Sequence, residues 1–197
     1  MRKLPRSLEN PIDTLCVDLA EAMSPALKAT GHTPNVITTY SAGSAALAVY
    51  ALHRGNLRVF SALWMLQYFW DCVDGHFARK YGMVTTWGDG YDHVTDVAGT
   101  LALVVVVLRR YTVPPWVMAV GAVVMLFNMM NLGCQQRYVH ARNGAARRES
   151  LDSLQPLCPG DDPGWLWWTA LFSHGTTHLA IVLLVWYLEK HHKKPGV

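Results

Sequence analysis

Long stretches without charged residues constrain this sequence more than any other feature. Residues 36–52 and 111–136 contain no Asp, Glu, Lys or Arg, residues 97–108 form a compact apolar run, and residues 163–188 contain two histidines as their only polar ionisable groups. Runs of roughly 18 apolar residues are long enough to cross a bilayer as helices, which satisfy their own backbone polar groups. Charged residues make up 16% of the 197 residues, against about 25% in soluble domains. The sequence therefore predicts an all-α integral membrane protein.

The apolar runs predict how the chain is organised. We expect a single membrane domain over residues 1–197, with a transmembrane bundle of five to six helices within residues 34–189. The first four spans are expected at residues 34–53, 56–81, 88–109 and 113–138. The last apolar segment, residues 163–188, has a length that suits one span. A break at residues 173–175 would instead make it a short helical hairpin.

Residues 9–28 predict an amphipathic helix that precedes the bundle. Apolar residues from Ile12 to Met23 recur at helical spacing, with acidic residues on the other side. This pattern is typical of a helix that lies in the membrane interface, here interrupted near Pro25. A helix packed on a soluble surface would show the same periodicity. We expect no cleavable signal peptide, because residues 1–30 lack a continuous apolar core.

Basic residues predict the orientation of the bundle. They gather before the first span, after the second span and in the 137–148 loop, three regions that we expect on the cytoplasmic side. The loop arginines either bind a lipid phosphate or are ordinary positive-inside residues. The net charge of +3 is too diffuse for a nucleic-acid footprint. The four cysteines show no metal-ligand spacing, so we interpret them as small apolar residues with reduced thiols.

Four aspartates stand at the ends of two predicted spans. Asp71 and Asp74 are three residues apart near the end of the second span, and Asp92 and Asp96 are four apart near the start of the third. Each pair lies on one helix face, and a tight turn would bring the two faces together. Charges at membrane depth mark functional sites, and four converging carboxylates need cations to stay ionised. Oxygen ligands favour hard ions, and two Mg²⁺ or Mn²⁺ ions are a known clamp for displacement at phosphorus.

The residues around these aspartates suit a phosphate ligand. Gly75 lets a bulky anion approach the backbone, and Arg79 offers a charged planar fork for phosphate oxygens. The whole pattern resembles the signature of the CDP-alcohol phosphotransferase family in every residue and spacing: Asp71-x2-Asp74-Gly75-x2-Ala78-Arg79-x8-Gly88-x3-Asp92-x3-Asp96. Residues 33–38 also resemble the entry of that family into its first span.

The resemblance implies an activity and assigns roles to these residues. Members of the family transfer a phosphate-linked group from a CDP-activated donor to an alcohol and release CMP, in phospholipid biosynthesis. Asp71, Asp74 and Asp92 would bind two metal ions, with Asp96 at or near them as the general base. The floor beneath the CDP group would be formed by Gly75, Ala78, Arg79 and Gly88. Many members are dimers, so a homodimer is a further expectation.

Two substrate pairs remain open within the family. CDP-diacylglycerol with a polar alcohol such as inositol, serine or glycerol phosphate is favoured, because 197 residues is a usual length for phosphatidyltransferases. A CDP-linked headgroup with diacylglycerol is the alternative, which the pair Asp92-His93 favours.

Two other classes of protein also place carboxylates among membrane helices. Intramembrane prenyltransferases lack the glycine and arginine pattern, and a divalent-cation transporter predicts acids in several spans.

Five further polar residues near the site have two interpretations each. Asp89 either caps the third span, which we favour, or binds a metal indirectly. His174 and His178, four residues apart in the last apolar segment, either pair on a metal or, as we favour, form hydrogen bonds within the bundle. His76 and His93 flank the acidic pairs, and either contact the substrates or point outward.

Overall fold

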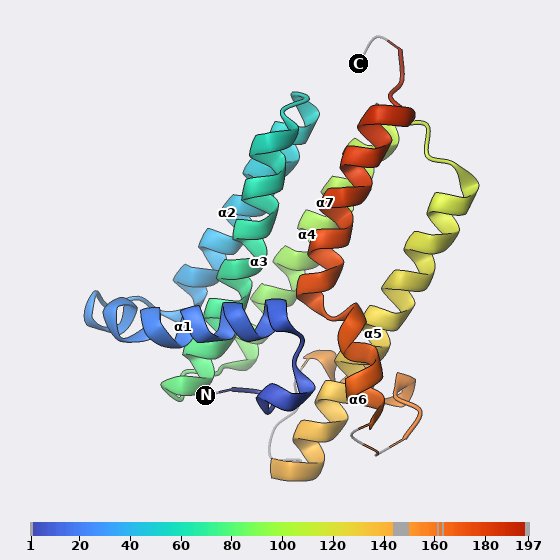
Figure 1. Cartoon of the computed structure of the whole chain (residues 1–197). Helices are drawn as coiled ribbons and strands as arrows, with labels where there is room; N and C mark the ends of the chain where they lie inside the picture. The colour runs from blue at the N-terminus through green and yellow to red at the C-terminus, as the bar shows by residue number, and fades with distance from the viewer. Residues whose placement is uncertain (1, 144–149, 161, 163, 196–197) are drawn as a thin grey trace.

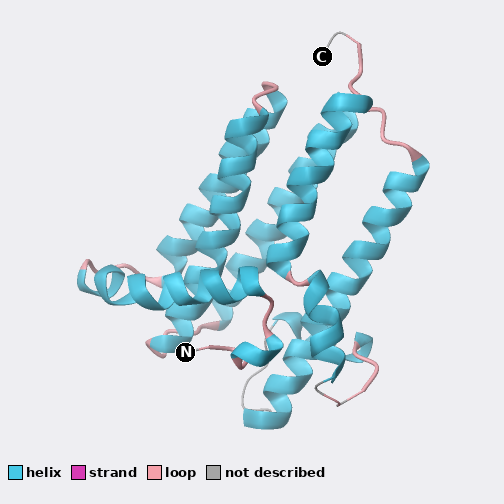
Figure 2. Ribbon diagram, viewed as in Figure 1, coloured by secondary structure: helices cyan, strands magenta, loops and turns pink. Residues whose placement is uncertain are grey.

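Helices make up nearly all of the regular structure in the part of the chain that the computed structural model describes, residues 2–143, 150–160, 162 and 164–195. The α-helices are α1 Pro11–Ala29, α2 Pro34–His53, α3 Leu57–Lys80, α4 Thr86–Arg110, α5 Pro115–Asn143, α6 Gly164–Thr169 and α7 His174–His191, and the 3-10 helices are η1 Arg6–Leu8, η2 Ser150–Leu157 and η3 Ala170–Phe172. Figure 2 shows them joined by short loops. The predicted all-α architecture is confirmed, with the first four predicted spans matching α2 to α5.

The long helices run side by side, and α1 lies across them near one end (Figure 1). Helix α2 packs along α3 and α4, while α7 contacts α3 and α5. The N-terminus, the α3–α4 turn and the last turns of α5 lie at one end, and the C-terminus lies at the other (Figure 1). The described parts of the three basic regions that were predicted to share one side therefore lie at the same end of the molecule.

Three segments of the described chain are long and apolar enough to cross a membrane, judged by length and composition: Thr86–Arg110, Pro115–Arg142 and Gly164–His191. Helices α2 and α3 have 20 and 24 residues, lengths that also match the hydrocarbon thickness. The last segment breaks at Ser173, whose backbone is extended. Helix α7 continues from the break toward the far end (Figure 1), so this segment is a single candidate span and forms no hairpin.

Apolar packing joins four helices at the end away from α1. Buried residues that include Leu52, Phe60, Leu103 and Leu188 form one cluster between α2, α3, α4 and α7. Arg110 closes this end, because its Nη1 donates to the carbonyl of His53 (2.9 Å) and its Nη2 lies 3.7 Å from Glu189 Oε2. This arginine thus holds two helix ends together, which accounts for a basic residue on the side opposite the other basic regions.

Helix α1 is continuous through Pro25, so the predicted interruption is wrong. Proline at this position cannot donate a hydrogen bond to the carbonyl of Glu21. Lys80 Nζ of α3 lies 3.3 Å from that carbonyl and supplies the missing donor. Leu15 and Leu19 are exposed, whereas Ala20 is fully buried. An outward apolar face is consistent with the predicted position in the membrane interface.

Two of the four cysteines form a disulfide, so the prediction of reduced thiols is wrong for them. Cys134 of α5 and Cys158, just after η2, are bonded across 24 residues of sequence. The fold brings them together because η2 turns back and packs along α5, a contact that no local spacing indicates. Arg137 Nη1 donates to the Cys158 carbonyl (3.1 Å) at the same place. Cys16 and Cys72 are free.

Candidate active site

The α3–α4 turn brings the two pairs of aspartates together. Asp71, Asp74 and Asp92 each place one carboxylate oxygen within 4.8 Å of the others. The α3–α4 turn is tight because Gly82 adopts a positive φ (64°) and Thr85 caps α4, its Oγ1 accepting from the Gly88 amide (2.9 Å). The convergence predicted from the spacings of three and four residues is therefore present.

Hydrogen bonds from neighbouring helices hold the carboxylates of Asp74 and Asp96 in place. Thr38 of α2 donates through Oγ1 to Asp74 Oδ2 (2.7 Å), and Asp74 is 4% exposed. Gln67, one turn before Asp71 on α3, donates through Nε2 to Asp96 Oδ1 (3.2 Å) and is itself buried. Sequence reasoning assigned no role to Gln67. An amide within an apolar span, one turn from an acidic residue, was the available signal.

The donor set fits divalent cations. Among the described residues, Asp92 Oδ1 and His174 Nε2 are buried without a hydrogen-bond partner. Asp71, Asp96 and His174 form a second group with ligand atoms within 4.8 Å of one another, and Asp71 belongs to both groups. Buried carboxylates this close repel one another unless a cation lies between them. Oxygen-rich groups of this kind suit Mg²⁺ or Mn²⁺.

The cluster opens onto a cavity of about 570 Å³. All four residues that were predicted to form the floor for the CDP group line it: Gly75, Ala78, Arg79 and Gly88. The guanidinium of Arg79 folds over Gly75, so that a Cβ at Gly75 would lie 3.1 Å from Nη1. At Gly88 a Cβ would meet Asn35 Oδ1 at 2.9 Å, so glycine permits the close approach of α4 to the start of α2. The predicted residues thus surround one cavity.

Asp89 does not cap α4, and its indirect binding of a metal stays a prediction. The cap of α4 is Thr85, and the Asp89 carboxylate lies in the first turn, where it accepts from the Ser150 amide at the start of η2 (2.7 Å). The cap interpretation is therefore wrong, although an acid still suits this end of a helix dipole. Asp89 joins η2 to α4 at the rim of the cavity, which Ser150 also lines.

The histidines separate into structural and cavity-facing residues. His178 is buried, with Nε2 bonded to Gln67 Oε1 (2.8 Å) and Nδ1 to the His174 carbonyl (2.9 Å). The favoured prediction of a bundle hydrogen bond is confirmed for His178. His76 is buried and pairs with Glu21 Oε2 (2.6 Å), so it faces α1 and does not point outward. His93 and His174 both line the cavity.

An ion pair fixes α1 against the end of α3. Lys80 Nζ lies 2.6 Å from Glu21 Oε1. The hydrogen bond from the Lys80 ammonium, followed by that from His76, lowers the pKa of the Glu21 carboxyl. In the 137–148 loop, Arg137 contacts the Cys158 carbonyl. Arg147 and Arg148 lie outside the described residues. Arg142 is exposed at the end of α5.

The fold and the site together define a helical membrane protein with a carboxylate cluster beside a ligand-sized cavity. The chain belongs to the CDP-alcohol phosphatidyltransferase family, whose model matches residues 31–188. Because the chain belongs to this family, it is neither an intramembrane prenyltransferase nor a divalent-cation transporter of the kinds considered above.

Several characterised proteins resemble the chain. Probable CDP-diacylglycerol–inositol 3-phosphatidyltransferase 2 of Arabidopsis thaliana is 39% identical over 56 residues, which are 28% of this chain and 25% of that protein. CDP-diacylglycerol–inositol 3-phosphatidyltransferase 1 of the same plant is 36% identical over 62 residues, 32% of this chain and 27% of that protein. The matches thus span about a quarter of each relative. The crystal structure of Mycobacterium tuberculosis phosphatidylinositol phosphate synthase with CDP-DAG bound aligns at a TM-score of 0.43 and 18% identity, covering 91% of this chain and 96% of that one.

Proposed function

We propose that the protein is a phosphatidyltransferase that transfers a phosphatidyl group from CDP-diacylglycerol to a polar alcohol and releases CMP. One observation carries the proposal: four carboxylates and Arg79 line a single cavity among membrane helices. The carboxylates suit metal ions that bind a diphosphate, and the guanidinium suits its remaining oxygens. The two plant relatives named above use CDP-diacylglycerol as donor, which supports a lipid donor here.

A row of amides on α5 supports a polar acceptor. Asn128, Asn131 and Gln135 line the cavity on one face of α5, a helix whose first half is apolar. Asn131 Nδ2 donates to Thr169 Oγ1 (3.0 Å), and Gln135 Nε2 donates to Asn131 Oδ1 (2.7 Å). A polar face inside a membrane helix is costly unless it serves a site. Amides recognise hydroxyl groups well, so we propose inositol as the first acceptor to test, followed by serine and glycerol phosphate.

We propose a role for each aspartate in this reaction. Asp71, Asp74 and Asp92, with Asp96 beside them, would hold two Mg²⁺ or Mn²⁺ ions. When bound, such ions neutralise charge on the diphosphate and on the departing CMP. The acceptor hydroxyl oxygen forms a bond to the β-phosphorus as the bond from that phosphorus to the oxygen of CMP breaks. Asp96 accepts the hydroxyl proton, and Gln67 fixes the orientation of its carboxylate.

The proposal extends to the surroundings of the site. The three basic regions at the site end favour a cytoplasmic orientation of that end, and the exposed apolar residues of α4, among them Leu101 and Val105, favour contact with lipid or with a second copy. Reactivity of cysteines introduced at each end, in sealed vesicles, measures the orientation. Light scattering in detergent measures the oligomeric state.

The direct test is CMP release by the purified protein in lipid nanodiscs. The assay contains CDP-diacylglycerol, Mg²⁺ or Mn²⁺, and one alcohol at a time. A second arm supplies CDP-choline or CDP-ethanolamine with diacylglycerol. CMP release in the first arm supports the proposal, whereas release only in the second arm assigns the protein to the headgroup-transferring branch. No release with any pair contradicts the proposal.

Asp96→Asn tests the assignment of the base. This change keeps the volume of the side chain and removes its capacity to accept a proton, so we expect CMP release to fall at least about 100-fold. Binding of the CDP donor is expected to remain. The matched control is Asp89→Asn, which alters a carboxylate in the same helix that accepts from the Ser150 amide and belongs to neither group of candidate metal ligands. A high rate in Asp96→Asn would contradict the assignment.

A further inference from the structure

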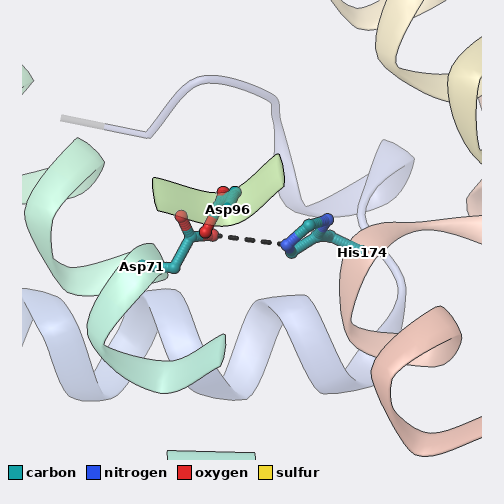
Figure 3. Close-up of side chains that lie close together, drawn as sticks. All are labelled: Asp71, Asp96 and His174. Atoms are coloured by element: carbon teal, nitrogen blue, oxygen red, sulfur yellow. Dashed lines mark ion pairs between the residues drawn. The ribbon is translucent and has the colours of Figure 1, made fainter. Parts of the chain in front are cut away.

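The first residue of α7 places an imidazole at the edge of the carboxylate cluster. His174 Nε2 lies 3.6 Å from Asp71 Oδ2. Figure 3 shows the ring reaching from α7 toward Asp71 of α3 and Asp96 of α4. One ligand atom from each of these three residues lies within 4.8 Å of the other two. Three helices thus converge on one point through a nitrogen and two carboxylates.

The environment of His174 differs from that of the neighbouring histidine. Both ring nitrogens of His178 are engaged, with Gln67 and with the backbone. His174 Nε2 is buried, yet no hydrogen-bond partner for it exists within the described part of the chain. A buried polar atom without a partner costs free energy. Its contact with Asp71 Oδ2 at 3.6 Å is an ion-pair distance and too long for a hydrogen bond, so a cation held by all three groups would supply a partner.

Helix α1 fixes the backbone on which this histidine stands. Asn10 Nδ2 donates to the Ala170 carbonyl (3.2 Å) and to Ser173 Oγ. Asp13 Oδ1 accepts from the Gly175 amide (3.1 Å). The residues immediately before and after His174 are therefore anchored to the start of α1. A backbone anchored on both sides restricts where the His174 side chain can lie, which lowers the entropic cost of binding a ligand.

We propose that His174 is a nitrogen ligand of the metal ion held by Asp71 and Asp96. The inference rests on the proposed metal-dependent transferase function and adds a residue from α7 to the aspartates of the sequence motif. The site at Asp71, Asp74 and Asp92 then has only oxygen donors from these side chains, whereas the site at Asp71 and Asp96 has a mixed set. The two sites differ in chemistry although they share Asp71.

A mixed donor set changes which metal the protein prefers. Mg²⁺ binds oxygen and retains its waters, whereas imidazole favours first-row transition ions over Mg²⁺, with an effect that is smaller for Mn²⁺ than for Co²⁺. We therefore expect the protein to bind Mn²⁺ more tightly than Mg²⁺ at this site. Replacing the imidazole with a carboxylate should lower the ratio of Mn²⁺ to Mg²⁺ affinity about tenfold or more, the scale on which residues around a metal affect binding.

The test uses the whole protein in nanodiscs, loaded with Mn²⁺ and without donor or acceptor. Pulsed electron paramagnetic resonance detects the hyperfine coupling of a ¹⁴N nucleus bound directly to Mn²⁺. Labelling the histidines with ¹⁵N identifies that nitrogen as imidazole without any mutation. The variants are His174→Gln and His174→Asp, of which the second keeps a metal ligand in place. His93→Gln is the matched control, because His93 lines the same cavity and belongs to neither group of ligands.

The expected result is a directly bound imidazole nitrogen in the wild type and in His93→Gln, and its loss in both His174 variants. Persistence of the coupling in His174→Asp would overturn the inference. Mn²⁺ bound without nitrogen in the wild type would also overturn it, and CMP release by the same sample would then leave the transferase proposal intact. Nitrogen coupling without CMP release from any substrate pair would support the ligand and contradict the transferase. A wild type that binds no Mn²⁺ would overturn both.

Discussion

Replacing Gly175 with alanine tests whether the start of α1 positions the α7 side of the site. A Cβ at Gly175 would lie 2.6 Å from both Asp13 Oδ1 and the Tyr68 hydroxyl, and 2.8 Å from Ile12 Cγ2. The two oxygens would have to retreat by about 0.8 Å to reach ordinary contact. That movement would break the hydrogen bond from the Gly175 amide to Asp13 and strain the one from Tyr68 to the same oxygen.

The magnitude follows from these contacts. Overpacking costs about 1–3 kcal/mol, and a weakened hydrogen bond to a carboxylate about 1.5–3 kcal/mol. The gain in helix propensity from glycine to alanine offsets up to about 1 kcal/mol. We therefore expect Gly175→Ala to lower the free energy of unfolding by about 2–4 kcal/mol. For a chain of this size that corresponds to a melting temperature lower by roughly 5–15 °C.

Thermal unfolding followed by tryptophan fluorescence in detergent measures the effect, and CMP release measures its consequence for the site. The control is Gly43→Ala, because Gly43 lies in α2 with nothing within 4 Å of the added Cβ. That variant should be unchanged or slightly stabilised. Equal melting temperatures for the two variants would refute the reasoning. A smaller effect of Gly175→Ala in an Asp13→Ala background would confirm that the two positions are coupled.

Three further predictions concern the metal, the support of the carboxylates and the end of α1. Chelation of divalent ions should abolish CMP release, and Mg²⁺ or Mn²⁺ should restore it. Thr38→Val keeps the shape of the side chain but removes the hydrogen bond to Asp74, so the affinity for Mg²⁺ should fall about 10–100-fold. The lowered pKa of Glu21 means that its pair with Lys80 stabilises the fold above the ordinary Glu pKa and is lost as the pH falls through the lowered value. Glu21→Gln should therefore reduce the melting temperature at pH 7 but hardly change it near pH 3.

Each of these predictions has a result that would contradict it. Full activity after exhaustive chelation would remove the role of metal ions. Unchanged Mg²⁺ affinity in Thr38→Val, with Thr39→Val as the matched control on the exposed side of α2, would show that Asp74 needs no support from α2. An equal loss of stability at both pH values in Glu21→Gln would show that packing, and not charge, fixes α1.

The sequence predicted α2 to α5 and the acidic cluster well, because both depend on short-range patterns. Uncharged runs set the helices, and the intervals of three and four residues set the faces that carry Asp71, Asp74, Asp92 and Asp96. The short α3–α4 turn, which contains Gly82, then brings the two faces together. Their roles as metal ligands, and that of Asp96 as base, stay predictions that the experiments above address.

Features that depend on contacts between distant segments escaped prediction. Helix α1 passes Pro25 because Lys80, 55 residues later, donates to the carbonyl that the proline leaves unpaired. Asp89 meets Ser150 across 61 residues, and His174 meets Asp71 from a helix near the other end of the sequence. Periodicity reports which face of a helix is polar but not which distant group the face will meet. A histidine in an apolar run was a visible signal, although its partner was not.

The disulfide between Cys134 and Cys158 makes one wall of the cavity sensitive to the redox state of the compartment that it faces. It holds η2 on α5, and η2 in turn contributes Ser150 and Leu151 to the cavity wall. Disulfides persist in oxidising compartments and are reduced in the cytosol. In a reducing compartment this wall would be held by hydrogen bonds and packing alone, and in an oxidising one it is a closed covalent loop. On the cytoplasmic side, where we propose that the site end lies, this bond would be reduced, and the cavity wall would then depend on those noncovalent contacts.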